Sequence, residues 1–151
     1  LEVAPIRSIE RIEVQADEDI SPLEANLPQA GRLVMTIKAE EVAKTELIFK
    51  SDQEKIAVLK LDSVSGVLSL ERFDPAPAFS PDYAQINECR VDVGSQAIKL
   101  DIFIDSCSME IFINDHRSVM TSCIFPTRDL ELSIKSEYGG SVFEDVKLYS
   151  I

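Results

Sequence analysis

Apolar and polar residues alternate along most of the chain from residue 33 onward, and a period of two is typical of β-strands with one buried face. The segments with this pattern are short and follow one another at intervals of about eight to twelve residues. No stretch of about twelve residues with helical periodicity separates them. The pattern predicts ten strands: 33–39, 45–50, 55–62, 67–72, 86–93, 97–105, 108–114, 117–125, 129–136 and 141–151.

Short strands without intervening helices favour antiparallel pairing, because a parallel pair needs a crossover of a dozen or more residues. A chain of 151 residues is also long enough to bury one hydrophobic core. A closed barrel would show similar strand spacing. Between the two, we predict an all-β protein whose residues 32–151 form an antiparallel β-sandwich of two sheets.

The first 31 residues show a different pattern. Residues 6–12 hold three isoleucines, each three residues after the last, and Pro5 precedes them. This spacing predicts a short helix or an irregular connector. Residues 16–31 contain two prolines and many acids, which predicts a loop. We expect residues 1–31 to be an interdomain linker segment and loop.

The charge balance narrows the range of partners. Lys and Arg number 15 against 27 Asp and Glu, which gives a net charge of −12. Such a field repels phosphate backbones, so nucleic acid is excluded as a partner and the acidity is interpreted as favouring solubility. No apolar run approaches the ~20 residues that span a bilayer, so no membrane contact is expected.

The cysteines and the single histidine argue against a metal centre. Cys89, Cys107 and Cys123 are odd in number, lack the CxxC spacing and are accompanied only by His116. A zinc site needs four closely spaced ligands, and a disulfide framework needs an even number of cysteines. We expect structural thiols in a reducing cytoplasm, without a metal or a cofactor.

Residues 105–115, DSCSMEIFIND, alternate strictly and are predicted to form a strand and hairpin. Asp105 and Glu110 could be considered as a catalytic acid pair. Residues five apart on one strand point to opposite faces about 16 Å apart, whereas glycosidase carboxylates lie roughly 5 to 10 Å apart. Together with the lack of a phosphate loop, a Ser/His/Asp set or an HExxH motif, this predicts no active site in the chain.

Sugar contacts would require exposed aromatic rings. Trp is absent, and most Phe residues occupy alternating strand positions, where we expect them in the core. Tyr83, in the loop PAFSPDYAQ, is the one aromatic side chain retained as a candidate for ligand contact.

The segment LDIFIDSCSMEIFINDHRSVMTSCIFP, residues 100–126, resembles the C-terminal β-sandwich module of glycoside hydrolase family 32, which includes invertases, levanases, inulinases and sucrose-6-phosphate hydrolases. That module typically shows an Asp, small polar residues, an acid, an apolar-Phe-apolar-Asn-Asp-Gly hairpin and Thr-Ser-Arg-Ile-Phe-Pro. The matching residues are Asp105, Ser108, Glu110, Phe112, Asn114, Asp115, Thr121, Ser122, Ile124, Phe125 and Pro126. A looser likeness covers residues 65–73 and the N-terminal segment.

The sequence departs from the family pattern at four positions. Ser106 and Cys123 stand where the family usually has Arg, Cys107 where it has Ser, and His116 where it has Gly. Arginine offers a planar fork of donors that pairs with carboxylates. Contacts that relatives make through these two arginines, to another domain or to a sugar, are therefore not expected here.

The resemblance implies a concanavalin-like or jelly-roll sandwich and a hydrolase that retains configuration when it cleaves β-fructofuranosides. In the family the catalytic acids lie in an N-terminal five-bladed propeller, so this chain itself is expected to be non-catalytic. The resemblance implies that the sandwich stabilises the propeller of the same polypeptide and contributes to a homodimer, and that the matched motif residues serve structure or an interface.

The same resemblance, with the acidic composition and free thiols, favours a bacterial cytoplasmic enzyme that acts on sucrose, sucrose 6-phosphate or fructans. Contact of the sandwich with sugar is left open. The alternative is a free-standing carbohydrate-binding or protein-interaction β-sandwich.

Overall fold

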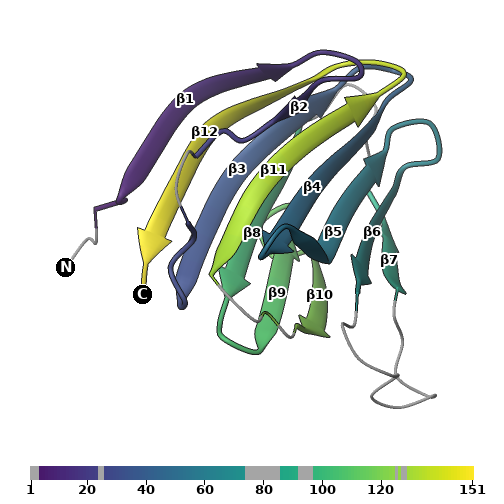
Figure 1. The fold of residues 1–151 in the computed structure, drawn as a ribbon. Helices are drawn as coiled ribbons and strands as arrows, with labels where there is room; N and C mark the ends of the chain where they lie inside the picture. The colour runs from purple at the N-terminus through teal and green to yellow at the C-terminus, as the bar shows by residue number, and fades with distance from the viewer. Residues whose placement is uncertain (1–3, 24–25, 74–85, 92–96, 125, 127–128) are drawn as a thin grey trace.

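A computed structural model describes residues 4–23, 26–73, 86–91, 97–124, 126 and 129–151. Within these ranges every regular element is a β-strand (Figure 1). The strands are β1 Arg7–Val14, β2 Asp19–Ile20, β3 Gly31–Ala39, β4 Lys44–Ser51, β5 Glu54–Asp62, β6 Val67–Arg72, β7 Ile86–Arg90, β8 Ile98–Ile104, β9 Ser108–Ile113, β10 Ser118–Cys123, β11 Leu130–Glu137 and β12 Ser141–Ser150. Each of the ten predicted segments overlaps one of them.

The strands form two six-stranded sheets, and all of their pairings are antiparallel. Sheet A has the order β1-β12-β3-β8-β9-β10, and sheet B has the order β2-β11-β4-β5-β6-β7. Figure 1 shows sheet B in front of sheet A, with both chain ends at the same end of the molecule. The predicted antiparallel sandwich of two sheets is confirmed.

The hydrophobic core lies between the two sheets and takes one side of almost every strand. On β8, for example, Ile98, Leu100, Ile102 and Ile104 are buried, while the residues between them are exposed or half-buried. Alternate side chains of a strand point to opposite faces, so this pattern follows directly from the sequence. The aromatic residues of the core are Phe49 and Phe143, both with no exposed surface.

The prediction of a short helix or irregular connector near the N-terminus is wrong, because residues 7–14 form strand β1 along the edge of β12. Ile9 and Ile12 are half-buried against the core, and the other residues of β1 are mostly exposed. An edge strand with so few inward residues carries little period-two signal. The conformation of β1 depends on its pairing with the backbone N–H and C=O groups of β12, and local sequence does not reveal this pairing. The proposed domain boundary at residue 31 stays a prediction.

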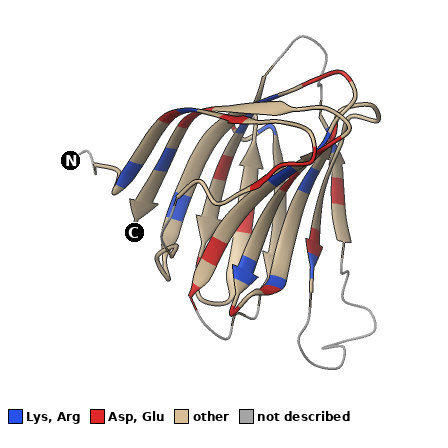
Figure 2. Ribbon diagram, turned by 45° about the horizontal axis from the view of Figure 1, so that its top comes forward, with Lys and Arg blue, Asp and Glu red and all other residues tan. Residues whose placement is uncertain are grey.

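Most charged residues lie on the outward side of the strands, whereas Arg72 is only 3% exposed and shares the buried phase of β6 with Leu68 and Leu70. Figure 2 shows Lys and Arg interspersed with Asp and Glu along the strands. Described ion pairs join neighbouring strands, as in Lys38 Nζ to Glu144 Oε1 at 2.8 Å and Lys60 Nζ to Glu46 Oε1 at 3.6 Å. The described part of the chain contains no helix of the length and apolarity needed to cross a membrane.

Candidate functional site

The outer face of sheet A carries an ordered set of aromatic and charged side chains. Strand register aligns these residues in rows that cross β9, β8, β3 and β12. Successive side chains of a strand point to opposite faces, so these outward residues alternate in sequence with core residues. One row is Phe112, Asp101, Val34 and Lys147, and the next is Glu110, Phe103, Arg32 and Tyr149.

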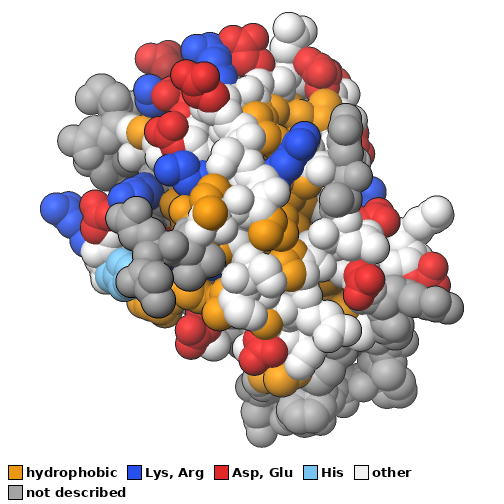
Figure 3. Space-filling view, turned by 90° about the vertical axis from the view of Figure 1, so that its left-hand side faces the viewer, with side chains coloured by type: hydrophobic (Ala, Val, Ile, Leu, Met, Phe, Trp, Pro, Cys, Tyr) orange, Lys and Arg blue, Asp and Glu red, His pale blue; other side chains and the backbone are white. Residues whose placement is uncertain are grey.

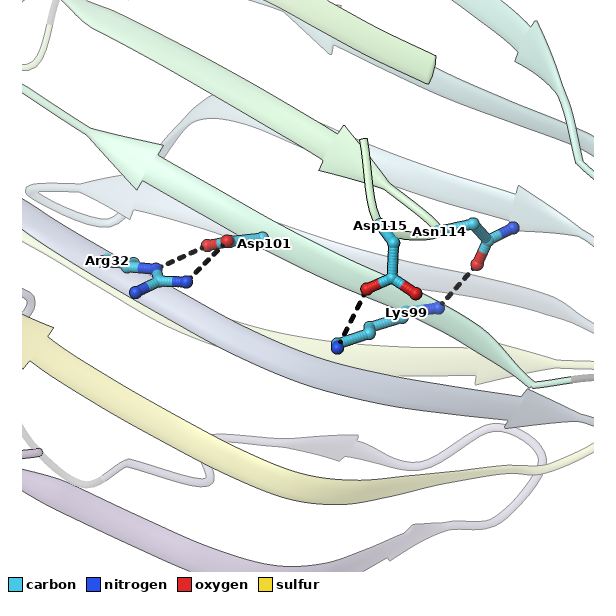
Figure 4. Close-up of polar contacts among 5 residues, drawn as sticks. All are labelled: Arg32, Lys99, Asp101, Asn114 and Asp115. Carbon is cyan, nitrogen blue, oxygen red and sulfur yellow. Dashed lines mark hydrogen bonds and ion pairs between the residues drawn. The ribbon is translucent and has the colours of Figure 1, made fainter. Parts of the chain in front are cut away.

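The centre of this face is a forked ion pair between Arg32 and Asp101. Arg32 donates from Nε to Asp101 Oδ1 at 2.8 Å and from Nη2 to Oδ2 at 2.7 Å, as Figure 4 shows. The hydrogen bond to Asp101 raises the pKa of Arg32 above its ordinary value, and the nearby charge of Asp101 adds to this effect. The two parallel bonds fix the plane of the guanidinium group.

Aromatic rings surround this ion pair. The guanidinium carbon of Arg32 lies 5.3 Å from the ring centre of Phe103 and 5.6 Å from that of Tyr149. Phe103 in turn meets Phe112 edge to face, with 5.7 Å between the ring centres. Cation–π contacts of this kind hold an arginine in place while part of it stays in water.

The β9–β10 turn borders the same face and contains three consecutive left-handed residues. Asn114, Asp115 and His116 have φ values of 51°, 57° and 70°. Asn114 forms two 2.9 Å hydrogen bonds with the backbone of Lys99: its N–H donates to the carbonyl, and its Oδ1 accepts from the N–H. Asparagine tolerates this backbone conformation, and here its side chain extends the β8–β9 ladder by one residue.

The next two residues of the turn also face the outer surface of sheet A. Asp115 Oδ1 accepts from Lys99 Nζ at 3.1 Å (Figure 4). The His116 ring stacks on Phe112, with 4.5 Å between ring centres and 29° between ring planes. The histidine that replaces the usual glycine of the hairpin thus places an additional ring on this face.

These side chains enclose a groove of about 640 Å³, which we call the sheet A groove. Six of the residues that line it are Arg32, Asp101, Phe112, His116, Lys147 and Tyr149. Its size falls within the roughly 300 to 1,000 Å³ of small-molecule sites. Its lining is more polar than that of most such sites, because six of the eleven lining residues are charged.

The structure separates the predicted motif residues into two groups. Ser108, Glu110 and Phe112 alternate with the core residues of β9 and therefore face outward, and Thr121 pairs with Glu110 from β10. Asn114 and Asp115 form the turn at the edge of the groove. The motif therefore contributes mainly to the outer face of sheet A.

The other described motif residues lie elsewhere. Asp105 and Pro126 line a separate cavity of about 310 Å³ together with Asp129. Ser122 is buried, and its Oγ donates to the carbonyl of Cys123 at 3.2 Å. Phe125 and Tyr83 fall outside the described residues, so their predicted roles stay predictions.

The prediction that residues 105–115 form one strand and hairpin needs a correction at its start. Asp105 to Cys107 connect β8 to β9: the N–H of Asp105 donates to the carbonyl of Ser108 at 2.9 Å, and Asp105 Oδ1 accepts from the N–H of Ser106 at 2.6 Å. Small polar residues favour such local bonds over a continuous ladder. Asp105 and Glu110 thus belong to different elements, a turn and a strand.

Sequence analysis assigned most Phe residues to the core and so did not predict the outward ring of Phe103, whereas the family motif did include Phe112. Phe103 lies between the buried Ile102 and Ile104, and Phe112 between the buried Ile111 and Ile113. Both therefore occupy the polar phase of their strands. That phase is a signal in the sequence, because a large ring out of phase with the core faces outward.

The cysteines form no bonded pair. Cys89, Cys107 and Cys123 are free, and burial raises the pKa of the Cys89 thiol above its ordinary value. Among the described residues, no cluster of three or more His, Cys, Asp or Glu side chains has the arrangement of a metal site.

Comparison with known proteins first places the fold. Galectin LEC-6 from Caenorhabditis elegans aligns with 93% of this chain and 94% of its own chain, with a TM-score of 0.66 and 10% identity. The chain is thus a β-sandwich of the concanavalin-like class.

The family model for the C-terminal part of glycosyl hydrolases family 32 matches residues 8–150. The chain belongs to this family of C-terminal domains, and the resemblance in residues 100–126 is confirmed.

Individual relatives agree with the family. The sucrose-6-phosphate hydrolase of Escherichia coli is 40% identical over 55 residues, which are 36% of this chain and 12% of that protein. The structure of an exo-inulinase from Aspergillus awamori has a TM-score of 0.74 and 17% identity, over 97% of this chain and 29% of the inulinase. The chain therefore spans less than a third of either hydrolase.

Proposed function

We propose that this chain is the C-terminal sandwich of a β-fructofuranosidase-type hydrolase and stabilises a catalytic propeller that belongs to the same polypeptide. The match of the family model to residues 8–150 carries this proposal. The small share of the inulinase chain that the sandwich spans supports a larger partner domain. The motif residues then serve the fold of the sandwich and its surfaces.

We place the contact with the propeller at the end of the sandwich where β1 begins. Ile6 and Ile151 leave 59% and 70% of their surface exposed there, and both are tied to the sheet through backbone bonds to Leu148 and Ala30. Figure 3, which views the molecule from the side of β1, shows hydrophobic side chains in the middle of that side. Exposed apolar surface of this kind is typical of an interface.

We further propose that the parent enzyme cleaves sucrose, sucrose 6-phosphate or fructans in a bacterial cytoplasm, and that the sandwich contributes to a homodimer. The name of the Escherichia coli relative supports sucrose 6-phosphate, and the free thiols support a reducing compartment. The substrate is tested by comparing the rates at which the full-length enzyme hydrolyses the three classes.

The experiment for the stabilising role compares the thermal unfolding of the full-length enzyme with that of a version lacking residues 1–151. We expect the truncated enzyme to melt at a lower temperature, because an apolar interface would become exposed to water. An unchanged melting temperature would contradict the proposal.

A pair of matched variants tests the position of the interface. Ile6→Asp and Ile151→Asp in the full-length enzyme should lower its melting temperature, since each would place a charge in the contact. Val64→Asp is the control, because Val64 is 68% exposed in the turn between β5 and β6. Equal effects of all three substitutions would remove this assignment.

A further inference from the structure

The sheet A groove is not explained by the fold or by the proposed contact at the start of β1. Its rings come from the outward phase of β9 and β12 and from the β9–β10 turn, so the core would form without them. Phe112 and His116 stack on each other at one side, and Tyr149 stands beside Arg32 across the sheet. Polar side chains at those positions would keep the sheet soluble, so the rings suggest a ligand.

The polar groups of the groove are held in place before any ligand arrives. Both bonds of the Arg32–Asp101 fork are shorter than 3 Å, and two rings flank the guanidinium group. The Asp101 side chain is 13% exposed, whereas that of Arg32 is 41% exposed. Arg32 Nη1 donates to no described residue, so its N–H groups remain available beside the rings. A fixed donor loses little conformational entropy on binding.

The charges of the groove favour a neutral ligand. Arg32 is paired with Asp101 and Lys99 with Asp115, so each of these cations already has its counter-ion. Lys147 forms no ion pair with a described residue, but Asp145 lines the same groove. The chain as a whole carries a net charge of −12. An anionic ligand such as a phosphate ester would therefore meet balanced charge locally and repulsion at longer range.

The backbone argues against a peptide, and the lining argues against a lipid. The groove lies on the face of a sheet whose β8 and β3 strands are paired on both sides, so no open edge is present for strand addition. An acyl chain would require an apolar lining, whereas Asp, Lys and Arg side chains line this groove. A polyhydroxylated ring satisfies both features, because its hydroxyls bond to charged groups and its C–H face packs on aromatic rings.

We propose that the sheet A groove binds a short neutral oligosaccharide. One sugar ring packs against the stacked Phe112 and His116, and its hydroxyls accept from Arg32 Nη1 and donate to the carboxylate of Asp101. Tyr149 contacts the neighbouring ring of the oligosaccharide. This binding site is separate from any catalytic reaction and holds whether or not the chain acts within a fructofuranosidase.

The first test is a titration of the 151-residue chain followed by amide chemical shifts. The probes are inulin-type fructo-oligosaccharides, galactosyl oligosaccharides and malto-oligosaccharides, with a sulfated heparin oligosaccharide as the anionic probe. We expect saturable shifts at Lys99, Asp101 and Phe112 with at least one neutral probe. The proposal is overturned if no neutral probe saturates, if the heparin oligosaccharide binds more tightly, or if the shifts gather outside sheet A.

Two substitutions remove one wall of the groove each. His116→Gly suits the φ of 70° and deletes the ring that stacks on Phe112, so the turn should still fold. Tyr149→Ala deletes the ring beside Arg32. We expect each to weaken binding about tenfold, which is the size of a typical ring contact. Arg32→Lys keeps the charge but removes the fork and should also weaken binding.

The matched control is Tyr138→Asn, because Tyr138 is a 71% exposed aromatic residue in the β11–β12 turn, and asparagine tolerates its φ of 71°. Its affinity should equal that of the parent chain. Parent-like binding by both His116→Gly and Tyr149→Ala would overturn the proposal, and so would an equal loss in the control.

Discussion

The outer faces of the two sheets differ although the same alternation of residues builds both. On sheet B the outward positions at the centre are aliphatic: Ile48 and Val58 are neighbours in register and are only 3% and 6% exposed. Charged residues with long side chains, among them the paired Glu46 and Lys60, share that face. Methylene stems of such residues cover apolar neighbours while their charges stay in water.

Sheet A places rings and paired charges at the corresponding positions and leaves a groove between them. The Arg32–Asp101 pair is fixed by a fork and two rings, whereas the Lys60–Glu46 pair of sheet B is a single 3.6 Å contact. A period-two pattern determines which residues face outward. The chemical type of those residues then determines whether their side chains pack against one another or leave a groove open to a ligand.

The largest expected effect comes from the core behind the groove. Leu100→Ala should lower the free energy of unfolding by about 3 kcal/mol, because Leu100 has no exposed surface and the cavity would not refill. Denaturation by urea, followed by circular dichroism, measures the change. A loss below about 1 kcal/mol would mean that the inward side of β8 is less tightly packed than described.

The next substitution compares the two outer faces directly. Ile48→Ala on sheet B should cost about 2 to 3 kcal/mol, since the side chain is almost fully buried there. Val34→Ala on sheet A should cost less than about 1 kcal/mol, because Val34 is half-buried beside an open groove. Equal losses of unfolding free energy for the two variants, measured by urea denaturation, would contradict the described difference between the faces.

The left-handed turn beside the groove gives a smaller effect. Asn114→Ala removes the hydrogen bond to the N–H of Lys99 and places alanine at a φ of 51°, so we expect a loss of about 2 kcal/mol. Asn114→Gly keeps the backbone freedom and should cost only about half as much. A glycine variant that is no better than the alanine variant would show that backbone strain plays no part.

A double-mutant cycle measures the fork of sheet A. Replacing Arg32 and Asp101 by alanine, singly and together, should give a coupling of about 1 kcal/mol, because the Arg32 side chain is 41% exposed and water partly screens the pair. The same cycle on Lys60 and Glu46 of sheet B should give a smaller value, since a lysine makes a single contact there. A larger coupling free energy for Lys60 and Glu46 than for Arg32 and Asp101 would contradict the contrast between the two ion pairs.

The smallest effect depends on pH. Hydrogen bonding to Lys38, aided by its charge, holds the pKa of Glu144 below its ordinary value. The folded state therefore gains stability from this carboxylate above the unfolded pKa of about 4.3 and loses it as the pH falls through the lower folded value. Glu144→Gln should melt slightly below the parent at about pH 7 and level with it at about pH 2. A difference that grows on acidification would contradict this assignment.

Much of the fold could be predicted because alternation is a local property. Each of the ten predicted segments overlaps a strand, and the sandwich follows from their spacing. Strand β1 was missed for two reasons. Few of its residues pack against the core, and two of these, Ile9 and Ile12, are only half-buried. Its partner strand β12 lies more than a hundred residues away in the sequence. No local pattern encodes that partner.

The groove was harder to predict than the strands. The motif in residues 100–126 identified Phe112 and the Asn114 turn, and both border the groove. Arg32 and Tyr149 come from β3 and β12, and only the register of those strands brings them to the same row. Register depends on long-range pairing, so a single sequence indicates the outward residues without showing which of them meet.

The position of β12 between β1 and β3 also has a consequence for synthesis of the protein. Strand β12 is synthesised after all the other described strands, so β1 and the β12-facing edge of β3 have no partner until then. Non-local pairing of this kind folds slowly and exposes strand edges that promote aggregation. Premature termination before residue 141 would leave both edges permanently open, and such fragments should be substrates for chaperones and proteases.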